Sequence, residues 1–193
     1  SSLDQRARES VMDILKRVSR SLNVPVIHVT HDYSEAATLA DRILVLDRGT
    51  PIQTGTVREL FWQPRTRFVA DFLGMQNILS GATKRDADGS VRIRFGSAAI
   101  PHETTGEPGQ DIQFCIHPEE VRLSASTQAG QQWCEGTVTE LAQQGFSVRT
   151  RILVGSETVT ARTPTREFPN QDITVGATVF VELRPSCIHV LRD

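Results

Sequence analysis

The sequence feature that most restricts the fold is a short apolar run at residues 24–30, Val-Pro-Val-Ile-His-Val-Thr, which ends at His31 and Asp32. Runs of this length that are rich in β-branched residues are typical of strands covered on both faces in a parallel sheet. Amphipathic helical patterns flank the run on both sides, so it predicts the middle strand of a β-α repeat. Open α/β sheets bind ligands at the carboxyl ends of their strands. His31 is therefore the first candidate site residue.

The segments on either side of this run predict an α/β part. Before it, apolar residues recur at helical spacing across residues 7–22, and Ser2 and Gln5 have the spacing of a capping box. After it, the predicted order is a helix begun by a capping box at Asp32 and Glu35, a hairpin of residues 43–46 and 51–53, a helix capped by Thr56 and Glu59, and a short helix at 68–73 that stops at Gly74.

From about Asn77 the hydrophobic period changes from helical to two. Apolar and polar residues alternate as far as Leu183, and clusters of Gly, Pro, Asp and Ser separate the runs. This pattern predicts a small all-β barrel or sandwich. We therefore expect two domains, an α/β part at residues 1–76 and a β domain at residues 77–193.

Composition excludes several classes of protein. The chain has 38% apolar and 23% charged residues, as expected of a soluble globular protein. A net charge of -2, a pI near 6.2 and the lack of a basic run argue against nucleic-acid partners and anionic membrane patches. No apolar stretch approaches the roughly 20 residues that span a bilayer, and no signal-peptide pattern is present. We expect a cytoplasmic protein.

The cysteines and scattered histidines do not predict a metal site. The three cysteines are an odd number with wide, irregular spacing, which suits neither a disulfide framework nor a zinc site. The histidines of the β region lack the spacing of metal ligands. We interpret the cysteines as reduced core residues; the residues concerned are Cys115, Cys134, Cys187, His102, His117 and His189.

Several short motifs follow one another in the first eighty residues. They are Ser-Ser-Leu-Asp at 1–4, Val-Thr-His-Asp at 29–32, Ala-Asp-Arg-Ile at 40–43, Leu-Asp-Arg-Gly at 46–49 and Gln-Thr-Gly at 53–55. In this order and spacing they resemble the second half of an ABC-transporter ATPase domain. The resemblance implies a partial P-loop ATPase fold, with ATP and Mg²⁺ as cofactors of the parent protein. It further implies that Ser2, Leu3 and Asp4 form the D-loop, which meets the opposite subunit in an ATP-bound dimer, and that His31 is the H-loop switch histidine.

The remainder resembles a TOBE domain, an OB-like β barrel found on ATPase subunits of importers. Phe-Leu-Gly-Met-Gln-Asn at 72–77 resembles the junction into that domain, and Ile-His-Pro-Glu-Glu-Val-Arg-Leu at 116–123 resembles one of its segments, with His117 in place of the usual arginine. Residues 182–191 most resemble the molybdate/tungstate branch, which implies an oxyanion ligand. Where oxyanion-binding modules carry Ser-Ala-Arg-Asn, however, residues 131–134 are Gln-Gln-Trp-Cys.

Each candidate residue also has a plainer interpretation. On periodicity alone, His31 is better interpreted as an exposed strand-end histidine without a role; the motifs in register around it reverse that preference. Ser2 and Asp4 could serve simply to cap the first helix, and both roles are compatible. We expect His28 to be a packed histidine bonded to a neighbour, and Asp32 to be a helix cap rather than a metal ligand.

The leading hypothesis is the C-terminal part of the ATP-hydrolysing subunit of an ABC importer for a small solute, an oxyanion such as molybdate or tungstate, peripheral on the inner face of the cell membrane. Its expected partners are a second ATPase subunit and transmembrane permease subunits. The alternative is a regulatory ligand-sensing or dimerisation β module of an importer for iron, sugar or polyamine. The sequence contains no Gly-rich phosphate loop, Q-loop, Leu-Ser-Gly-Gly-Gln element or Walker B pair, so the chain alone is expected to be inactive and without cofactor.

Overall fold

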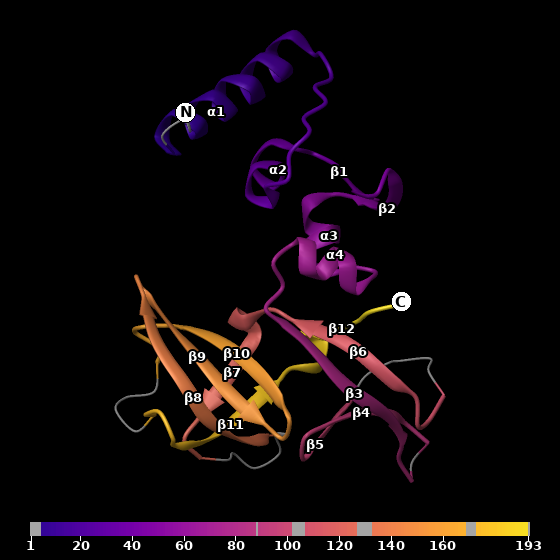
Figure 1. Cartoon of the computed structure of the whole chain (residues 1–193), viewed down its shortest axis with the longest axis vertical. Coiled ribbons are helices and arrows are strands. Elements are labelled where there is room, and N and C mark those ends of the chain that lie inside the picture. Colours follow the sequence, from indigo (N-terminus) through magenta and orange to yellow (C-terminus); the bar gives the residue numbers. More distant parts are fainter. Residues whose placement is uncertain (1–4, 88, 102–106, 127–132, 169–172, 193) are drawn as a thin grey trace. The chain divides into compact units, whose positions relative to one another are not determined.

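The computed structural model describes residues 5–87, 89–101, 107–126, 133–168 and 173–192 (Figure 1). The chain divides into two compact units, Ser1–Pro64 and Arg65–Asp193. The candidate residues Ser2, Leu3 and Asp4 lie outside the described residues. Within the described residues, no helix combines the length and apolar character that crossing a membrane requires.

The first unit contains, in order, α1 (Gln5–Leu22), α2 (Tyr33–Leu39), β1 (Ile43–Asp47), β2 (Thr50–Gly55) and α3 (Val57–Trp62). Strands β1 and β2 pair antiparallel, which confirms the predicted hairpin. Both turn residues, Arg48 and Gly49, have positive φ angles (46° and 81°), as two-residue hairpin turns of the primed type require. The short helices and the hairpin thus follow their local sequence signals.

Residues 24–30 form no strand, so the prediction of a central sheet strand is wrong. They have no regular secondary structure, and the side chains of Ile27 and Val29 are 93% and 89% exposed. A parallel strand needs neighbours whose backbone groups complete its hydrogen-bond ladder. In the described part of this unit the sheet pairing is confined to β1 and β2, which pair with each other. The expected α/β sheet of a P-loop ATPase is therefore not formed by these residues.

The second unit begins with α4 (Arg67–Phe72) and is otherwise almost entirely β structure. In its described residues the strands form two five-stranded antiparallel sheets, ordered β12-β6-β3-β4-β5 and β10-β9-β8-β11-β7 (Figure 1). This confirms the predicted all-β domain. The strands are β3 (Asn77–Arg85), β4 (Val91–Phe95), β5 (Ala98–Pro101), β6 (Asp111–Ile116), β7 (Val121–Ser124), β8 (Cys134–Gln144), β9 (Ser147–Val154), β10 (Glu157–Pro164), β11 (Thr178–Leu183) and β12 (His189–Val190).

Both sheets contribute to one hydrophobic core. The alternation predicted from the sequence is visible on β9, where every second residue from Val148 to Val154 is buried. Phe95 and Phe114 meet edge to face at the centre of this core, with ring centroids 5.7 Å apart. Both rings are at most 2% exposed.

Helix α4 packs with the β domain. Ala70 forms a small apolar cluster with Cys115 and Leu191, and the backbone N–H of Arg192 donates to the carbonyl of Arg65 at 2.7 Å. These contacts place the division between the compact units at Pro64, whereas the sequence predicted a boundary at residue 76.

Candidate functional site

The candidate switch residue His31 lies in the loop directly before α2, and its side chain is exposed. It precedes Asp32, the N-cap of the helix, by one residue. In the part of the chain that the structure describes, the imidazole of His31 makes no hydrogen bond or ion pair. The ring is therefore presented to solvent from a loop, and not from the strand end that the sequence predicted.

Asp32 caps α2, which confirms the prediction for this residue. Its Oδ1 accepts the backbone N–H groups of Ser34 and Glu35 at 2.8 and 3.4 Å. Its backbone has the extended conformation of an N-cap, with φ -98° and ψ 111°. The cap fixes the direction in which the chain enters the helix, immediately after His31.

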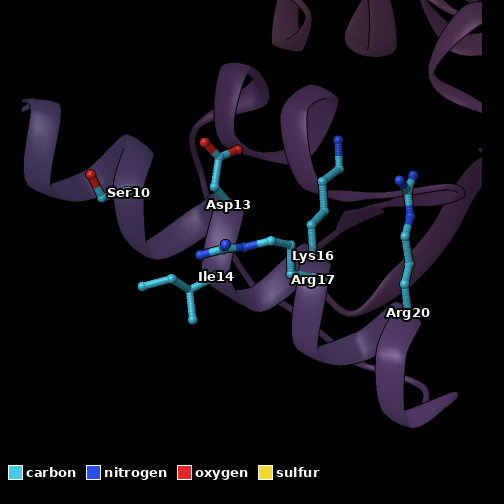
Figure 2. A pocket seen from close by; sticks show the side chains of 6 residues that line it. All are labelled: Ser10, Asp13, Ile14, Lys16, Arg17 and Arg20. Atoms are coloured by element: carbon cyan, nitrogen blue, oxygen red, sulfur yellow. The ribbon is translucent and has the colours of Figure 1, made fainter.

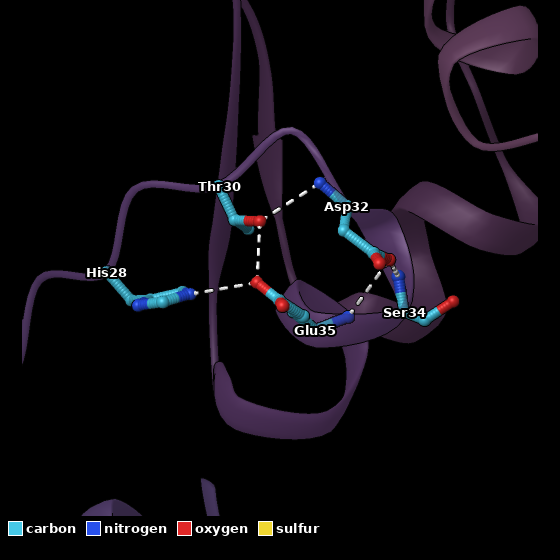
Figure 3. Close-up of polar contacts among 5 residues, drawn as sticks. All are labelled: His28, Thr30, Asp32, Ser34 and Glu35. Atoms are coloured by element: carbon cyan, nitrogen blue, oxygen red, sulfur yellow. Dashed lines mark hydrogen bonds and ion pairs between the residues drawn. The ribbon is translucent and has the colours of Figure 1, made fainter. Parts of the chain in front are cut away.

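Residues close to His31 in the sequence form a hydrogen-bonded group (Figure 3). The hydroxyl of Thr30 donates to Oε2 of Glu35 at 2.8 Å and accepts the backbone N–H of Asp32 at 3.0 Å. Nε2 of His28 lies 3.4 Å from the same Glu35 oxygen, an ion pair when the imidazole is protonated. His28 bonds a neighbour as expected, but its side chain is exposed rather than packed. The role of Thr30 was not predicted, and Glu35, expected to complete a capping box with Asp32, accepts from Thr30 instead.

A direct capping box occurs elsewhere in the same unit, at α3. Oγ1 of Thr56 accepts the N–H of Glu59 at 3.2 Å, and Oε2 of Glu59 accepts the N–H of Thr56 at 2.8 Å. Hydrogen bonds from the Thr56 backbone and side chain lower the pKa of the Glu59 carboxyl. The reciprocal geometry is what the Thr-x-x-Glu spacing predicts.

The His-Pro-Glu-Glu segment that resembles a TOBE motif forms η1 (Pro118–Glu120) in the β domain. Oε1 of Glu119 accepts a hydrogen bond from Nη1 of Arg162 at 2.9 Å. Glu120 forms an ion pair with Arg184 and accepts a hydrogen bond from the thiol of Cys187. The two carboxylates thus bind arginines that lie on or beside two different strands. This arrangement indicates a structural role for the segment.

The cysteines divide into two buried residues and one half-buried residue, all with free thiols. Burial raises the pKa of Cys115 to about 12 and that of Cys134 to about 11. In the described ranges, no group of three or more His, Cys, Asp or Glu side chains could hold a metal ion. Gln131 and Gln132, in the segment compared with oxyanion modules, lie outside the described residues.

An open hollow runs along α1 (Figure 2). All of its lining residues come from this one helix: Ser10, Asp13, Ile14, Lys16, Arg17 and Arg20. It does not bring together groups from different elements, and we assign it no function.

Comparison with known proteins first defines a class of domain. Residues 114–191 match the family model described as "TOBE domain". Among solved structures, the chain resembles one titled as the cytoplasmic molybdate-binding protein ModG with molybdate bound. The TM-score is 0.50 at 14% sequence identity, over 62% of this chain and 97% of that chain. At this identity the likeness shows the fold alone, and it agrees with the TOBE match.

The particular relatives are ATP-binding subunits of importers. The protein named spermidine/putrescine import ATP-binding protein PotA is 36% identical in Thermobifida fusca over 77% of this chain and 41% of the relative. The PotA proteins of Borreliella afzelii and Pseudomonas fluorescens are 32% and 31% identical over 100% of this chain and 52% of each relative. The chain thus spans about half the length of these relatives or less. They confirm the resemblance to ABC-importer ATP-binding subunits but do not support the molybdate/tungstate branch.

Proposed function

We propose that this chain is part of the ATP-binding subunit of an ABC importer that takes up a polyamine such as spermidine or putrescine. The observation that carries the proposal is the similarity to polyamine-import subunits, which extends over the whole chain in two relatives. Polyamine import was one of the alternatives that the sequence left open. The relatives favour it over the oxyanion that the C-terminal residues suggested.

In this proposal, His31 contacts the γ-phosphate of ATP. A histidine can donate a hydrogen bond to a phosphate oxygen and respond to loss of that phosphate on hydrolysis. The exposed imidazole, held next to a capped helix, fits such a role. Ser2, Leu3 and Asp4 are proposed to meet the opposite subunit as a D-loop. The parent protein would bind ATP together with Mg²⁺. Among the described residues, no group of three or more His, Cys, Asp or Glu side chains could hold that ion.

The proposed partners are a second copy of the subunit and the permease subunits of the transporter. The subunit would act at the inner face of the cell membrane, where it would contact the permease. Closure of two subunits around ATP would drive the change of access in the permease.

An uptake experiment tests the proposal. The gene is disrupted in its host, and initial rates of uptake of radiolabelled putrescine, spermidine and molybdate are measured with and without the wild-type gene on a plasmid. We expect the disruption to abolish polyamine uptake, the plasmid to restore it, and molybdate uptake to be unchanged. Loss of molybdate uptake with normal polyamine uptake would overturn the proposed solute.

Calorimetry tests the competing hypothesis that the β domain senses an oxyanion. Molybdate, tungstate, sulfate and spermidine are titrated into the protein under the same conditions. The proposal expects no tight, stoichiometric complex with any of the three oxyanions. A saturable molybdate complex would support the oxyanion-sensing alternative and contradict the polyamine assignment.

A further inference from the structure

Glu35 does not complete the capping box that its spacing from Asp32 predicts. In the direct box at α3, the glutamate accepts the N–H of the N-cap residue, Thr56. At α2 the corresponding N–H, that of Asp32, donates to the hydroxyl of Thr30. The Glu35 carboxylate then accepts a hydrogen bond from that hydroxyl. The threonine hydroxyl is therefore inserted between the two partners of the box.

This insertion closes a ring of hydrogen bonds among Thr30, Asp32 and Glu35. Thr30 is tied to Asp32 and Glu35, and Asp32 is tied back to the backbone of Glu35 through its carboxylate (Figure 3). His31 lies between Thr30 and Asp32. The ring fixes the residues on both sides of His31, while no described bond restrains the imidazole.

Capping alone does not account for this arrangement. A direct box, as at α3, would satisfy the N–H of the N-cap residue without fixing the residue two positions earlier. The inserted hydroxyl instead anchors Thr30, which is half-buried, to the first turn of α2. His28 extends the same group, with Nε2 3.4 Å from Oε2 of Glu35. The group therefore orders the loop ahead of the helix as well as the helix end.

We propose that Thr30 and Glu35 are positioning residues, which hold the loop so that His31 presents its imidazole to the γ-phosphate. The inference rests on the proposed function of His31. It assigns the orientation of the histidine to the hydrogen bonds among Thr30, Asp32 and Glu35. Small displacements of a group that contacts the transferring phosphate lower the rate of the chemical step more than substrate binding.

The test compares variants in the protein that carries this chain, purified with its transporter. Thr30→Val removes the hydroxyl at nearly constant volume, and Thr30→Ser retains it. Glu35→Ala removes the acceptor, whereas Glu35→Gln keeps an amide oxygen that can accept the threonine proton. Glu59→Ala is the matched control, because it removes a glutamate from the direct capping box of α3. The measurements are kcat and KM for ATP hydrolysis, and hydrogen exchange of the Asp32 amide.

We expect Thr30→Val and Glu35→Ala to lower kcat about tenfold with little change in KM. Thr30→Ser and Glu35→Gln should stay within about twofold of wild type, and Glu59→Ala should leave kcat unchanged. Exchange of the Asp32 amide should become about tenfold faster in Thr30→Val, because that N–H loses its acceptor.

Two other results separate the inference from the proposed function. If His31→Ala abolishes hydrolysis while Thr30→Val and Glu35→Ala keep the wild-type kcat, the positioning role is wrong and the function of His31 stands. If His31→Ala hydrolyses ATP at the wild-type rate, the proposed function of His31 fails and the positioning role fails with it. If Glu59→Ala lowers kcat as much as Thr30→Val and Glu35→Ala do, the loss reflects general destabilisation of the protein, and the inference is also overturned.

Discussion

The side-chain amide of Asn77 bonds the backbone of Thr160 in both directions. Nδ2 donates to the Thr160 carbonyl at 2.8 Å, and Oδ1 accepts the Thr160 N–H at 2.7 Å. Nδ2 also reaches the carbonyl of Ile116 at 3.2 Å. Asn77 is fully buried on β3, and Thr160 lies on β10 of the other sheet. The amide thus acts as a short piece of backbone that joins the two sheets.

Replacing Asn77 should therefore destabilise the β domain strongly. Asn77→Ala leaves the buried N–H and C=O of Thr160 without these partners, and each unsatisfied group costs about 1–3 kcal/mol. We expect a loss of about 3 kcal/mol in the free energy of unfolding, measured by urea denaturation. Ser80→Ala, at an exposed position on the same strand, should change it by less than about 0.5 kcal/mol. Equal stability of the two variants would contradict this account of Asn77.

Two phenylalanines of the β domain should respond very differently to the same substitution. Phe114 is fully buried against Phe95, whereas Phe146, in the turn between β8 and β9, is 96% exposed. Phe114→Ala should cost about 3–5 kcal/mol through lost transfer energy and the cavity left behind. Phe146→Ala should cost less than about 0.5 kcal/mol in the same denaturation experiment. A large cost at Phe146 would mean that the turn is packed in solution.

Thiol reactivity should follow burial. Because burial raises the pKa of Cys134 to about 11, about one molecule in a thousand carries its thiolate at pH 8, and Cys115, at about 12, carries fewer. Iodoacetamide should therefore modify Cys187 in the native protein and all three cysteines in denaturant. Mass spectrometry identifies the modified residues, and Cys187→Ser should abolish the native reaction. Rapid native modification of Cys115 would contradict its placement in the core.

Glu140 provides a pH-dependent prediction. Nη2 of Arg149 donates to its Oε1 at 2.5 Å, and Nη1 of Arg151 donates to its Oε2 at 3.0 Å. These arginines, Arg149 first, lower the pKa of the Glu140 carboxyl. Its contribution to stability is therefore present above the ordinary glutamate pKa and is lost as the pH falls through the lowered value.

Carboxyl carbon NMR shifts during an acid titration measure this pKa directly. In wild type, Glu140 should titrate below the ordinary glutamate value. Arg149→Met should raise its pKa toward the ordinary value, and Arg151→Met should raise it less. An ordinary pKa in the wild-type protein would show that the arginines do not pair with Glu140 in solution.

The elements that were predicted correctly depend on local signals. The hairpin at Arg48 and Gly49 and the capping box at Thr56 follow from a few neighbouring residues, and the β domain follows from its period of two. The strand expected at residues 24–30 does not form, because a parallel strand depends on neighbouring strands that no local pattern supplies.

The same distinction applies to the candidate site. The role of Asp32 as a cap followed from its position before a helical pattern. The role of His31 stays a prediction, which rests on the order of the surrounding motifs. The hydrogen bond from Thr30 to Glu35 was not predicted, because the spacing of Asp32 and Glu35 equals that of the direct capping box at Thr56 and Glu59. Side-chain geometry decides between the two arrangements. The bond from Asn77 to Thr160 joins residues 83 positions apart, beyond the reach of any local pattern.

The most direct measurement is the initial rate of radiolabelled spermidine uptake in cells whose sole copy of the gene carries His31→Ala. If the chain belongs to the ATP-binding subunit of a polyamine importer and His31 contacts the γ-phosphate, uptake should fall to the level of the gene disruption while the variant protein accumulates normally. Uptake at the wild-type rate would contradict the account.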